Sequence, residues 1–447
     1  MHTDRLIIEG LAGKKALKGK VQINGAKNAV LKAMAASVLF SDELVIANAP
    51  DTEDVKKLAH LLRLAGAEVS TDAAKKEIRI NASTIVSTDL DHETTKAMRG
   101  SVMLTGPLLA RFGKVSFNVP GGCVIGARPI DLYVDAYKKL GAKVVVKGDH
   151  YSIDGKLSGA EIFFALQTVG GTETMMMAAV LAKGTTVLKN CAMEPEIVSL
   201  AEFLVQCGAN ISGIGSPTMT IVGGGLLKSG GKKYHTIPDR IEAGSFLLLG
   251  ALCADDLLIE QCNPLHLESV TSALRNAGVP LTIGKDSIHI KGNAKTKWAD
   301  VSSFSVRTHE YPGFPTDLQP QMVAFLTHTN GEGIMFETIF EGRFKYVQDL
   351  IRMGAEITEM NPREVLVRGF GSENGSTQHN GNAKKLIALG KDEPLQAHDI
   401  RAGFAVVMAA LAAKGTSVIQ NVYYIDRGYE KLEERLAALG ATIRREK

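Results

Sequence analysis

The sequence predicts an α/β protein of two similar domains, each built from three β-α-β-α-β-β units around buried helices. Three observations predict this fold class. A helix pattern followed by Gly-Ala, or once by Gly-Val, and then by a strand pattern occurs six times. Each repeat also holds a second, more apolar helix pattern. The Gly- and Lys-rich residues 221–234, typical of a linker, divide the six repeats into three and three.

The first helix of each repeat is amphipathic and ends at a glycine. In the first copy Val55, Leu58 and Leu62 fall at i, i+3 and i+7, on one face of a helix. The following Gly66 supplies the left-handed residue that ends it. The repeats are 67 to 86 residues apart, which suits a small α/β module, and their glycines are Gly66, Gly141, Gly208, Gly278, Gly354 and Gly440.

The second helix of each repeat is apolar nearly all round, so we expect it to be buried. These helices are predicted within residues 29–40, 98–112, 174–182, 244–253, 322–329 and 402–413. The longest interval between repeats contains residues 371–385, which have no hydrophobic periodicity and are predicted to be a solvent-exposed insertion. Because ligands favour the interfaces between domains, we expect the functional site in a cleft between the two.

Composition excludes several classes of protein. With 51 Lys and Arg, 48 Asp and Glu and 45% hydrophobic residues, the chain is neither a polyanion-coating nor a disordered protein. No apolar stretch reaches the roughly 18 residues of a membrane-spanning helix. The N-terminus lacks the layout of a secretory signal, so a cytoplasmic location is expected. Five cysteines without a CxxC pair argue against a disulfide framework or a zinc site.

One cysteine differs from the others in its surroundings. Cys191, Cys207, Cys253 and Cys262 lie in apolar helix or strand patterns, where a cysteine is commonly a buried, inert thiol. Cys123 instead lies in the Gly-rich segment 119–132, five residues before Arg128. A thiol on such a loop near an arginine is placed to have a lowered pKa and to exchange a proton.

Several arginines fall at turns or at the starts of elements rather than on charged helix faces. Because Arg binds phosphate and carboxylate groups with two parallel hydrogen bonds, they indicate a small, multiply anionic ligand. These arginines are Arg99, Arg128, Arg240, Arg343, Arg401 and Arg427. For any single one of them, a solvated surface position is an equally good interpretation.

Three further segments are candidates for binding or catalysis. Lys27 and Asn28 precede an apolar helix, whose N-terminal amides favour an anion. Asp317 starts a helix, where it would either cap the helix or, among arginines, take a proton from a substrate hydroxyl. The turn at residues 166–171 has the Thr and backbone amides to hold a diphosphate. No dinucleotide, P-loop or metal-ligand spacing occurs, so we expect no cofactor and no metal.

The motifs NGAKNA, PGGCVIGARPIDL, EPEIV, PDRIEAG, FPTDLQPQ and YIDRGYE resemble those of one family essentially end to end. This family is the UDP-N-acetylglucosamine 1-carboxyvinyltransferases, which are enolpyruvyl transferases. The resemblance implies a pair of inside-out α/β barrels. One domain would span residues 27–234 and carry the Cys123 loop, and the other would combine residues 1–26 with 235–447.

The resemblance also implies a reaction, the transfer of the enolpyruvyl group of phosphoenolpyruvate to the 3′-hydroxyl of UDP-N-acetylglucosamine (UDP-GlcNAc). This reaction releases phosphate and starts peptidoglycan precursor synthesis. Cys123 would be the proton donor and the target of the epoxide fosfomycin, and Asp317 the base facing the sugar hydroxyl. Phosphoenolpyruvate would be held by Lys27, Asn28, Arg128, Arg343, Arg401 and Arg427.

The nucleotide sugar would contact a second set of residues. By resemblance these are Arg99, Arg128, Pro129, Ile130, Asp131, Leu132, Leu166, Gln167, Thr168, Val169, Gly170, Asp317 and Ile339. The sequence departs from the family at three places within or near this set. Leu166 and Gln167 stand where many members have Lys-Val, Met103 replaces a frequent Trp, and Tyr133 stands where a His is common.

Three alternatives remain open. The sister transferase acting on shikimate 3-phosphate shares the fold and chemistry, but it would have a GSKS-type first loop and lack the PGGC loop at residues 120–123. A protein that binds RNA ends is disfavoured by a net charge of +3 and a single Trp. A non-catalytic paralogue would most simply lack Cys123, Asp317 or Arg427, all of which are present.

Overall fold

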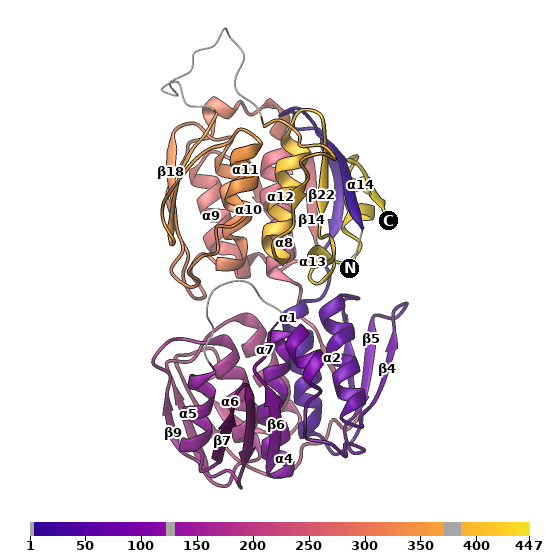
Figure 1. Ribbon diagram of the computed structural model, residues 1–447, viewed down its shortest axis with the longest axis vertical. Helices are drawn as coiled ribbons and strands as arrows, with labels where there is room; N and C mark the ends of the chain where they lie inside the picture. The colour runs from indigo at the N-terminus through magenta and orange to yellow at the C-terminus, as the bar shows by residue number, and fades with distance from the viewer. Residues whose placement is uncertain (1–3, 122–129, 371–385) are drawn as a thin grey trace. The chain divides into compact units, whose positions relative to one another are not determined.

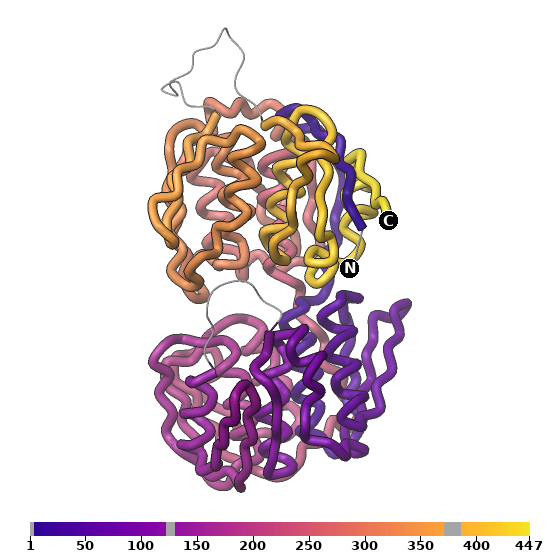
Figure 2. Tube along the Cα trace, viewed as in Figure 1, coloured from indigo at the N-terminus to yellow at the C-terminus, as the bar shows by residue number. Residues whose placement is uncertain are grey.

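A computed structural model of the chain describes residues 4–121, 130–370 and 386–447 (Figure 1). The chain forms two compact units. Unit 1 comprises the described parts of Met1–Asn24 and Pro238–Lys447, and unit 2 the described parts of Gly25–Ile237. The trace in Figure 2 shows the indigo N-terminal segment within unit 1, beside the yellow C-terminal segment. Each unit has its own hydrophobic core.

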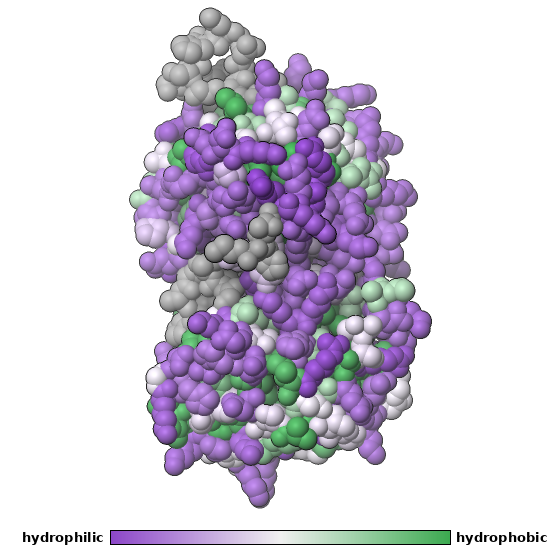
Figure 3. Space-filling model, turned by 45° about the vertical axis from the view of Figure 1, so that its right-hand side comes forward, coloured by the Kyte–Doolittle hydropathy of each residue, from purple (hydrophilic) through white to green (hydrophobic). Residues whose placement is uncertain are grey.

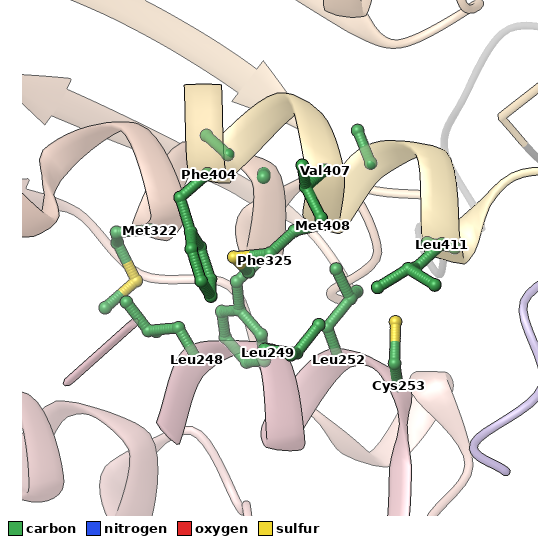
Figure 4. Close-up of a cluster of buried hydrophobic side chains, with 14 of the residues drawn as sticks. Leu248, Leu249, Leu252, Cys253, Met322, Phe325, Phe404, Val407, Met408 and Leu411 are labelled. Carbon is green, nitrogen blue, oxygen red and sulfur yellow. The ribbon is translucent and has the colours of Figure 1, made fainter. Parts of the chain in front are cut away.

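The core of unit 1 is formed by three apolar helices, α8 (Arg240–Cys253), α10 (Gln319–Leu326) and α12 (Ile400–Ala412). Figure 4 shows their side chains pointing toward one another, among them Leu248 of α8, Phe325 of α10 and Phe404 of α12, and all three are fully buried. Burying a side chain of this size contributes about 1.5–3 kcal/mol. The predicted burial of the second helix of each repeat is confirmed here.

Three four-stranded sheets surround these helices, each with a shorter helix. The sheets have the orders β15-β16-β14-β2, β17-β18-β20-β19 and β21-β22-β1-β23. Their strands are β2 (Leu17–Gln22), β14 (Ala254–Glu260), β15 (Leu281–Ile283), β16 (Ser287–Lys291), β17 (Val306–Arg307), β18 (Glu332–Phe336), β19 (Glu356–Asn361), β20 (Glu364–Arg368), β21 (Leu395–Gln396), β22 (Thr416–Gln420), β1 (Arg5–Glu9) and β23 (Thr442–Glu446). The shorter helices are α9 (Glu268–Asn276), α11 (Val347–Arg352) and α14 (Leu432–Ala438).

Two strands from the start of the chain complete unit 1. The sheet of β17 to β20 shows the order that each repeat follows. Its first strand, β17, runs parallel to the second, β18. Its last strand, β20, lies between β18 and β19 and is antiparallel to both. β2 takes the first position beside β14, and β1 takes the last position between β22 and β23. The first and last repeats of unit 1 are therefore closed by a segment that precedes unit 2 in the sequence.

Unit 2 repeats this plan, except that one of its three sheets has three strands. Its apolar helices are α1 (Lys27–Ala36), α4 (Thr105–Phe112) and α6 (Val169–Val180), and its other helices include α2 (Glu53–Leu64), α3 (His92–Ala97), α5 (Asp131–Lys139) and α7 (Pro195–Gln206). Its sheets have the orders β13-β3-β5-β4, β6-β8-β7 and β11-β12-β10-β9. The strands are β3 (Leu44–Ala47), β4 (Glu68–Asp72), β5 (Glu77–Asn81), β6 (Lys114–Asn118), β7 (Lys143–Lys147), β8 (His150–Asp154), β9 (Glu161–Phe163), β10 (Thr185–Lys189), β11 (Asn210–Ser212), β12 (Thr218–Val222) and β13 (Lys233–His235).

The six repeat glycines adopt the backbone conformation that the sequence predicts. All six have φ between 91° and 104°, in the region where a side chain would be strained, and each follows the amphipathic helix of its repeat. The predicted insertion at 371–385 lies outside the described residues. None of the helices in the described ranges has the length and apolar character that crossing a membrane requires. The face drawn in Figure 3 carries mostly hydrophilic residues.

Candidate active site

The first group of candidate residues lies in unit 1, at the N-terminal ends of buried helices. Asp399 caps α12 by accepting hydrogen bonds from the amides of Arg401 (2.8 Å) and Ala402 (3.0 Å), which fixes Arg401 in the first turn. Asp317 lies in the 3₁₀ turn Thr316–Leu318 that leads into α10. Neither this turn nor α10 has a side-chain cap, so Asp317 does not serve as a helix cap.

Asp317 is instead held between two buried guanidinium groups. Its Oδ1 accepts a hydrogen bond from Nη2 of Arg343 at 2.9 Å, and its Oδ2 accepts from Nε and Nη2 of Arg401, each at 3.3 Å. The side chains of Arg343 and Arg401 are 0% and 5% exposed, whereas that of Asp317 is 29% exposed. The carboxylate is therefore the most exposed group of this cluster.

The buried carboxylate of Glu337 organises the surroundings of Asp317. Glu337 accepts hydrogen bonds from the hydroxyls of Thr308 (3.0 Å) and Thr316 (2.7 Å) and from the amide of Ile339 (2.8 Å). Arg343 also donates to the Thr316 hydroxyl. Glu337 thus ties Ile339 to the turn that carries Asp317, and two of the residues predicted to contact the nucleotide sugar lie in one hydrogen-bonded cluster.

The two arginines are suited to bind an anion. Burial alone lowers the pKa of a guanidinium, but nearby Asp317 and other acidic or phenolic groups raise the pKa values of Arg343 and Arg401, so both stay charged. Within the described residues, Nε of Arg343 and Nη1 of Arg401 are buried and have no hydrogen-bond partner. Buried donors of this kind normally have partners, so these two nitrogens have capacity for a ligand's oxygens.

The segment that carries Arg427 packs against the start of α12. A Cβ added to Gly428 would lie 2.4 Å from Cγ2 of Ile400 and 3.7 Å from Nη1 of Arg401, so only glycine allows this approach. Next to it, the buried ring of Tyr429 lies 5.4 Å from the guanidinium carbon of Arg401. The Tyr429 hydroxyl lies 2.8 Å from the hydroxyl of Ser245, on α8. Asp317, Ile339, Arg343, Arg401 and the Arg427 segment thus belong to one region of unit 1.

The second group of candidate residues lies in unit 2. Lys27 is the first residue of α1, and its ammonium forms an ion pair with Asp54 at 3.0 Å; both side chains are less than 10% exposed. No side chain caps α1, since its N-cap residue is Ala26. Lys27 and the half-buried Asn28 thus lie at a helix N-terminus whose amides favour an anion.

The segments predicted to bind the nucleotide meet at the starts of α5 and α6. A Cβ on Gly170 would lie 2.1 Å from the hydroxyl of Tyr133, so the two residues are in close contact. Tyr133 follows Ile130, Asp131 and Leu132, and Gly170 follows Val169, the first residue of α6. The predicted contacts at 130–132 and 166–170 are therefore neighbours in unit 2.

Side-chain hydrogen bonds fix the turn before α6. The Thr168 hydroxyl caps α6 by accepting from the amide of Gly171 at 3.2 Å. The Gln167 amide donates to the carbonyl of Cys191 at 2.6 Å, while the Leu166 side chain is 69% exposed. The turn is thus anchored at its second and third residues.

Arg99, in the 3₁₀ helix Arg99–Leu104, contacts the start of the Gly-rich segment. Its Nη1 donates to the carbonyl of Pro120, the second residue of the Gly-rich segment 119–132, at 3.3 Å. Cys123, Arg128 and Pro129 themselves lie outside the described residues. Arg240, the remaining arginine of the predicted set, starts α8 and stacks over the ring of Tyr311 at 5.5 Å.

Several residues of these groups escape sequence reasoning. Asp54, Glu337 and Tyr429 partner the predicted residues, and nothing in their local patterns distinguishes them from ordinary surface or core positions. A charged residue inside an apolar helix, such as Lys32, is a signal that could have been used. Within the described part of the chain, no three His, Cys, Asp or Glu side chains are grouped so that they could hold a metal ion.

Comparison with solved structures identifies the fold. The chain superposes on the enolpyruvyl transferase NikO from Streptomyces tendae with a TM-score of 0.83 and 22% identity, covering 99% of both chains. It superposes on the EPSP synthase from Acinetobacter baumannii with a TM-score of 0.71 and 19% identity, covering 100% of both chains. The predicted fold class, two similar α/β domains like those of the enolpyruvyl transferases, is confirmed.

Comparison of sequences identifies the family. A family model described as EPSP synthase (3-phosphoshikimate 1-carboxyvinyltransferase) matches residues 11–436. The UDP-N-acetylglucosamine 1-carboxyvinyltransferase of Koribacter versatilis is 41% identical over 445 residues, 99% of this chain and 96% of the relative. That of Wolinella succinogenes is 42% identical over 439 residues, 97% of this chain and 98% of the relative. The chain belongs to the EPSP synthase family of enolpyruvyl transferases.

Proposed function

We propose that the protein transfers the enolpyruvyl group of phosphoenolpyruvate to the 3′-hydroxyl of UDP-GlcNAc. The observation that carries this proposal is the carboxylate of Asp317 held between the buried Arg343 and Arg401, a base among cations at the ends of helices. Relatives named UDP-N-acetylglucosamine 1-carboxyvinyltransferase, 41% and 42% identical over nearly the whole chain, support the choice of acceptor.

The reaction balances with the residues at hand. The 3′-oxygen adds to C2 of phosphoenolpyruvate while C3 takes a proton, which gives a tetrahedral intermediate. Loss of a proton from C3 and of phosphate from C2 then gives the enolpyruvyl ether. Asp317 takes the proton of the sugar hydroxyl, Cys123 donates a proton to C3, and the resulting Cys123 thiolate takes a proton back from C3 as phosphate leaves.

The arginines change partners during this reaction. In the free protein Arg343 and Arg401 bond Asp317. When the phosphate and carboxylate of phosphoenolpyruvate bind, the open donors on these arginines take up the ligand's oxygens, together with Arg128 and Arg427. Sharing the two positive charges with the ligand weakens their hold on Asp317, which makes its carboxylate a better proton acceptor.

The residues of unit 2 hold the rest of the substrates. Lys27 and Asn28 bind phosphoenolpyruvate at the uncapped N-terminus of α1. The nucleotide sugar contacts Arg99, the segment 128–132 and the turn 166–170, in addition to Asp317 and Ile339. The backbone amides of the turn are held ready for the diphosphate by the Thr168 cap.

The cellular role follows from the reaction. We place the protein in the cytoplasm, at the first committed step of peptidoglycan precursor synthesis, where it supports cell shape and division. The thiol of Cys123 makes it a target of fosfomycin. An unmodified, fully active wild-type protein after exposure to fosfomycin would contradict that assignment.

The direct test is phosphate release from phosphoenolpyruvate by the purified protein, with UDP-GlcNAc and with shikimate 3-phosphate as acceptors in parallel. We expect release with UDP-GlcNAc alone. Release with shikimate 3-phosphate alone would favour the second candidate, the activity for which the family model is described. Release with neither acceptor would contradict both.

Gly170 offers a test of the nucleotide contact. Gly170→Ala would place a methyl group 2.1 Å from the Tyr133 hydroxyl, and overpacking of this kind costs about 1–3 kcal/mol. We expect the KM for UDP-GlcNAc to rise by about tenfold, with little change in the KM for phosphoenolpyruvate. Without the hydroxyl the nearest atom of residue 133 is Cζ at 3.4 Å, an ordinary contact, so Tyr133→Phe should restore most of the loss in the double variant.

The single variant Tyr133→Phe is the control for that experiment. The nucleotide assignment of the turn is contradicted if Gly170→Ala leaves the KM for UDP-GlcNAc unchanged. If both KM values rise together, the turn affects the site as a whole rather than the nucleotide.

A further inference from the structure

The segment that presents Arg427 cannot hold its own conformation. It consists of the four-residue helix α13 (Tyr423–Asp426) and the turn that leads to α14, and no side chain caps either helix. A helix this short is unstable unless tertiary contacts hold it. The turn also contains Lys431 with φ of 48°, a conformation that non-glycine residues rarely adopt. The orientation of Arg427 therefore depends on the contacts that other parts of unit 1 make with this segment.

The guanidinium group of Arg445, on the C-terminal strand β23, bonds residues on both sides of the turn at 427–432. Nη1 and Nη2 of Arg445 donate to the two carboxylate oxygens of Asp426, at 2.8 and 2.7 Å. Nε and Nη2 of the same residue donate to the two oxygens of Glu433, at 2.6 and 3.1 Å. Asp426 immediately precedes Arg427, and Glu433 lies in the first turn of α14. Both bonds are bidentate, the geometry in which Arg fixes orientation best.

The strand that carries Arg445 is itself firmly placed. β23 pairs with β1 along its full length, with Arg445 opposite Leu6, and β1 pairs in turn with β22. Figure 1 shows this indigo strand beside the yellow C-terminal strands of unit 1. Arg445 also contacts Asp4 at 3.4 Å. The Arg445 guanidinium is therefore held in a defined position, and its hydrogen bonds to Asp426 restrain the adjacent Arg427.

We propose that Arg445 is a positioning residue for phosphoenolpyruvate binding, which holds Arg427 in place through Asp426 and Glu433. This inference rests on the proposed function, since it takes Arg427 to bind the substrate anion. Arg445 does not touch the substrate. It removes the freedom of the 427–432 turn before the substrate arrives, so that binding does not have to order this turn.

The test compares Arg445→Gln with Arg444→Gln. Arg444 is the adjacent residue on β23 and carries the same charge, but its side chain is 66% exposed and bonds only Glu446 in the described structure. We expect Arg445→Gln to raise the KM for phosphoenolpyruvate about tenfold and to leave the KM for UDP-GlcNAc within about twofold. Arg444→Gln should leave both constants unchanged. Arg445→Lys keeps the charge without the paired bonds and should recover only part of the loss.

A double variant shows whether the effect passes through Asp426. If it does, Asp426→Asn raises the same KM, and Arg445→Gln/Asp426→Asn is no worse than the more affected single variant. The inference is overturned if Arg445→Gln lowers only the melting temperature, or if it changes both KM values equally. These outcomes are measured in a protein that releases phosphate with UDP-GlcNAc. A wild-type protein without that activity would instead contradict the proposed function.

Discussion

Replacing Asp317 by Asn is expected to lower kcat for phosphate release by about 10²–10⁴-fold, the usual contribution of a general base. The amide keeps the shape of the carboxylate and one acceptor for Arg343 and Arg401, but it cannot take the proton of the sugar hydroxyl. Phosphoenolpyruvate should still bind, because the two guanidinium groups lose their competing carboxylate. The measurement is kcat and the dissociation constant of phosphoenolpyruvate in the same preparation.

Asp317→Asn should also lower the stability of the folded protein, and the binding of an anion should restore it. Without the negative charge, Arg343 and Arg401 become neighbouring buried cations, and breaking a buried ion pair costs about 3–5 kcal/mol. An anion that binds only the folded protein restores stability by mass action. We therefore expect phosphate or phosphoenolpyruvate to raise the melting temperature of Asp317→Asn more than that of the wild type.

Asp300→Asn is the matched control, since Asp300 is an exposed aspartate of the same unit. It should change neither kcat nor melting temperature. The base assignment fails if Asp317→Asn retains wild-type kcat per folded molecule. A loss of stability with normal kcat would mean that Asp317 only neutralises the two arginines.

Local sequence patterns predict the repeats, but they do not predict which distant strands complete the sheets of the first and last repeats. The glycines that end the amphipathic helices, and the apolar helices of the cores, are encoded within short stretches of sequence, and the structure confirms both. That β1 completes the last sheet of unit 1 and β13 the first sheet of unit 2 depends on pairing between segments far apart in the chain. Nothing in the residues of a strand specifies such a distant partner.

The candidate site shows the same division. Asp317, Arg343 and Arg401 were each singled out by residue type and position, and the structure brings all three together. Their supporting residues were not predicted, because Glu337 and Tyr429 look like ordinary strand-end and turn residues in sequence. Arg445 lies in a charged C-terminal run, IRREK, that is typical of an exposed chain end. Its hydrogen bonds to Asp426, Glu433 and Asp4, and its lower exposure, distinguish it from Arg444.

Two charged residues inside the apolar helices of unit 2, Lys32 and Glu173, form a buried ion pair. The ammonium of Lys32 on α1 lies 2.7 Å from Oε2 of Glu173 on α6, and both side chains are 4% exposed. Lys32 also donates to the carbonyl of Asn28 at 3.2 Å. The pair therefore joins two core helices next to the turn of α1 that carries Lys27 and Asn28.

Lys32→Met is expected to destabilise the protein by about 3–5 kcal/mol, because it leaves the Glu173 carboxylate buried without its cation. Lys20→Met is the control, since Lys20 makes a similar bond to Glu260 at 3.1 Å with a side chain that is 67% exposed. Exposed pairs contribute only about 0–1 kcal/mol. Urea unfolding of the two variants measures the difference, and equal losses would contradict the prediction.

The loss in Lys32→Met should also depend on pH in a fixed direction. Burial raises the pKa of Glu173 above its usual value of 4.5, Lys32 opposes this shift, and nearby Glu196 adds to it. Without Lys32 the folded protein holds a proton on Glu173 at pH values where the unfolded chain has lost it, so unfolding releases a proton and stability falls as pH rises through this range. Because the pKa of Glu173 is raised, the loss of stability of Lys32→Met relative to wild type should be smaller near pH 5 than near pH 8. Adding Glu173→Gln should remove the pH dependence, because the amide does not titrate, and a loss that is the same at both pH values would show that Glu173 is not the group left unpaired.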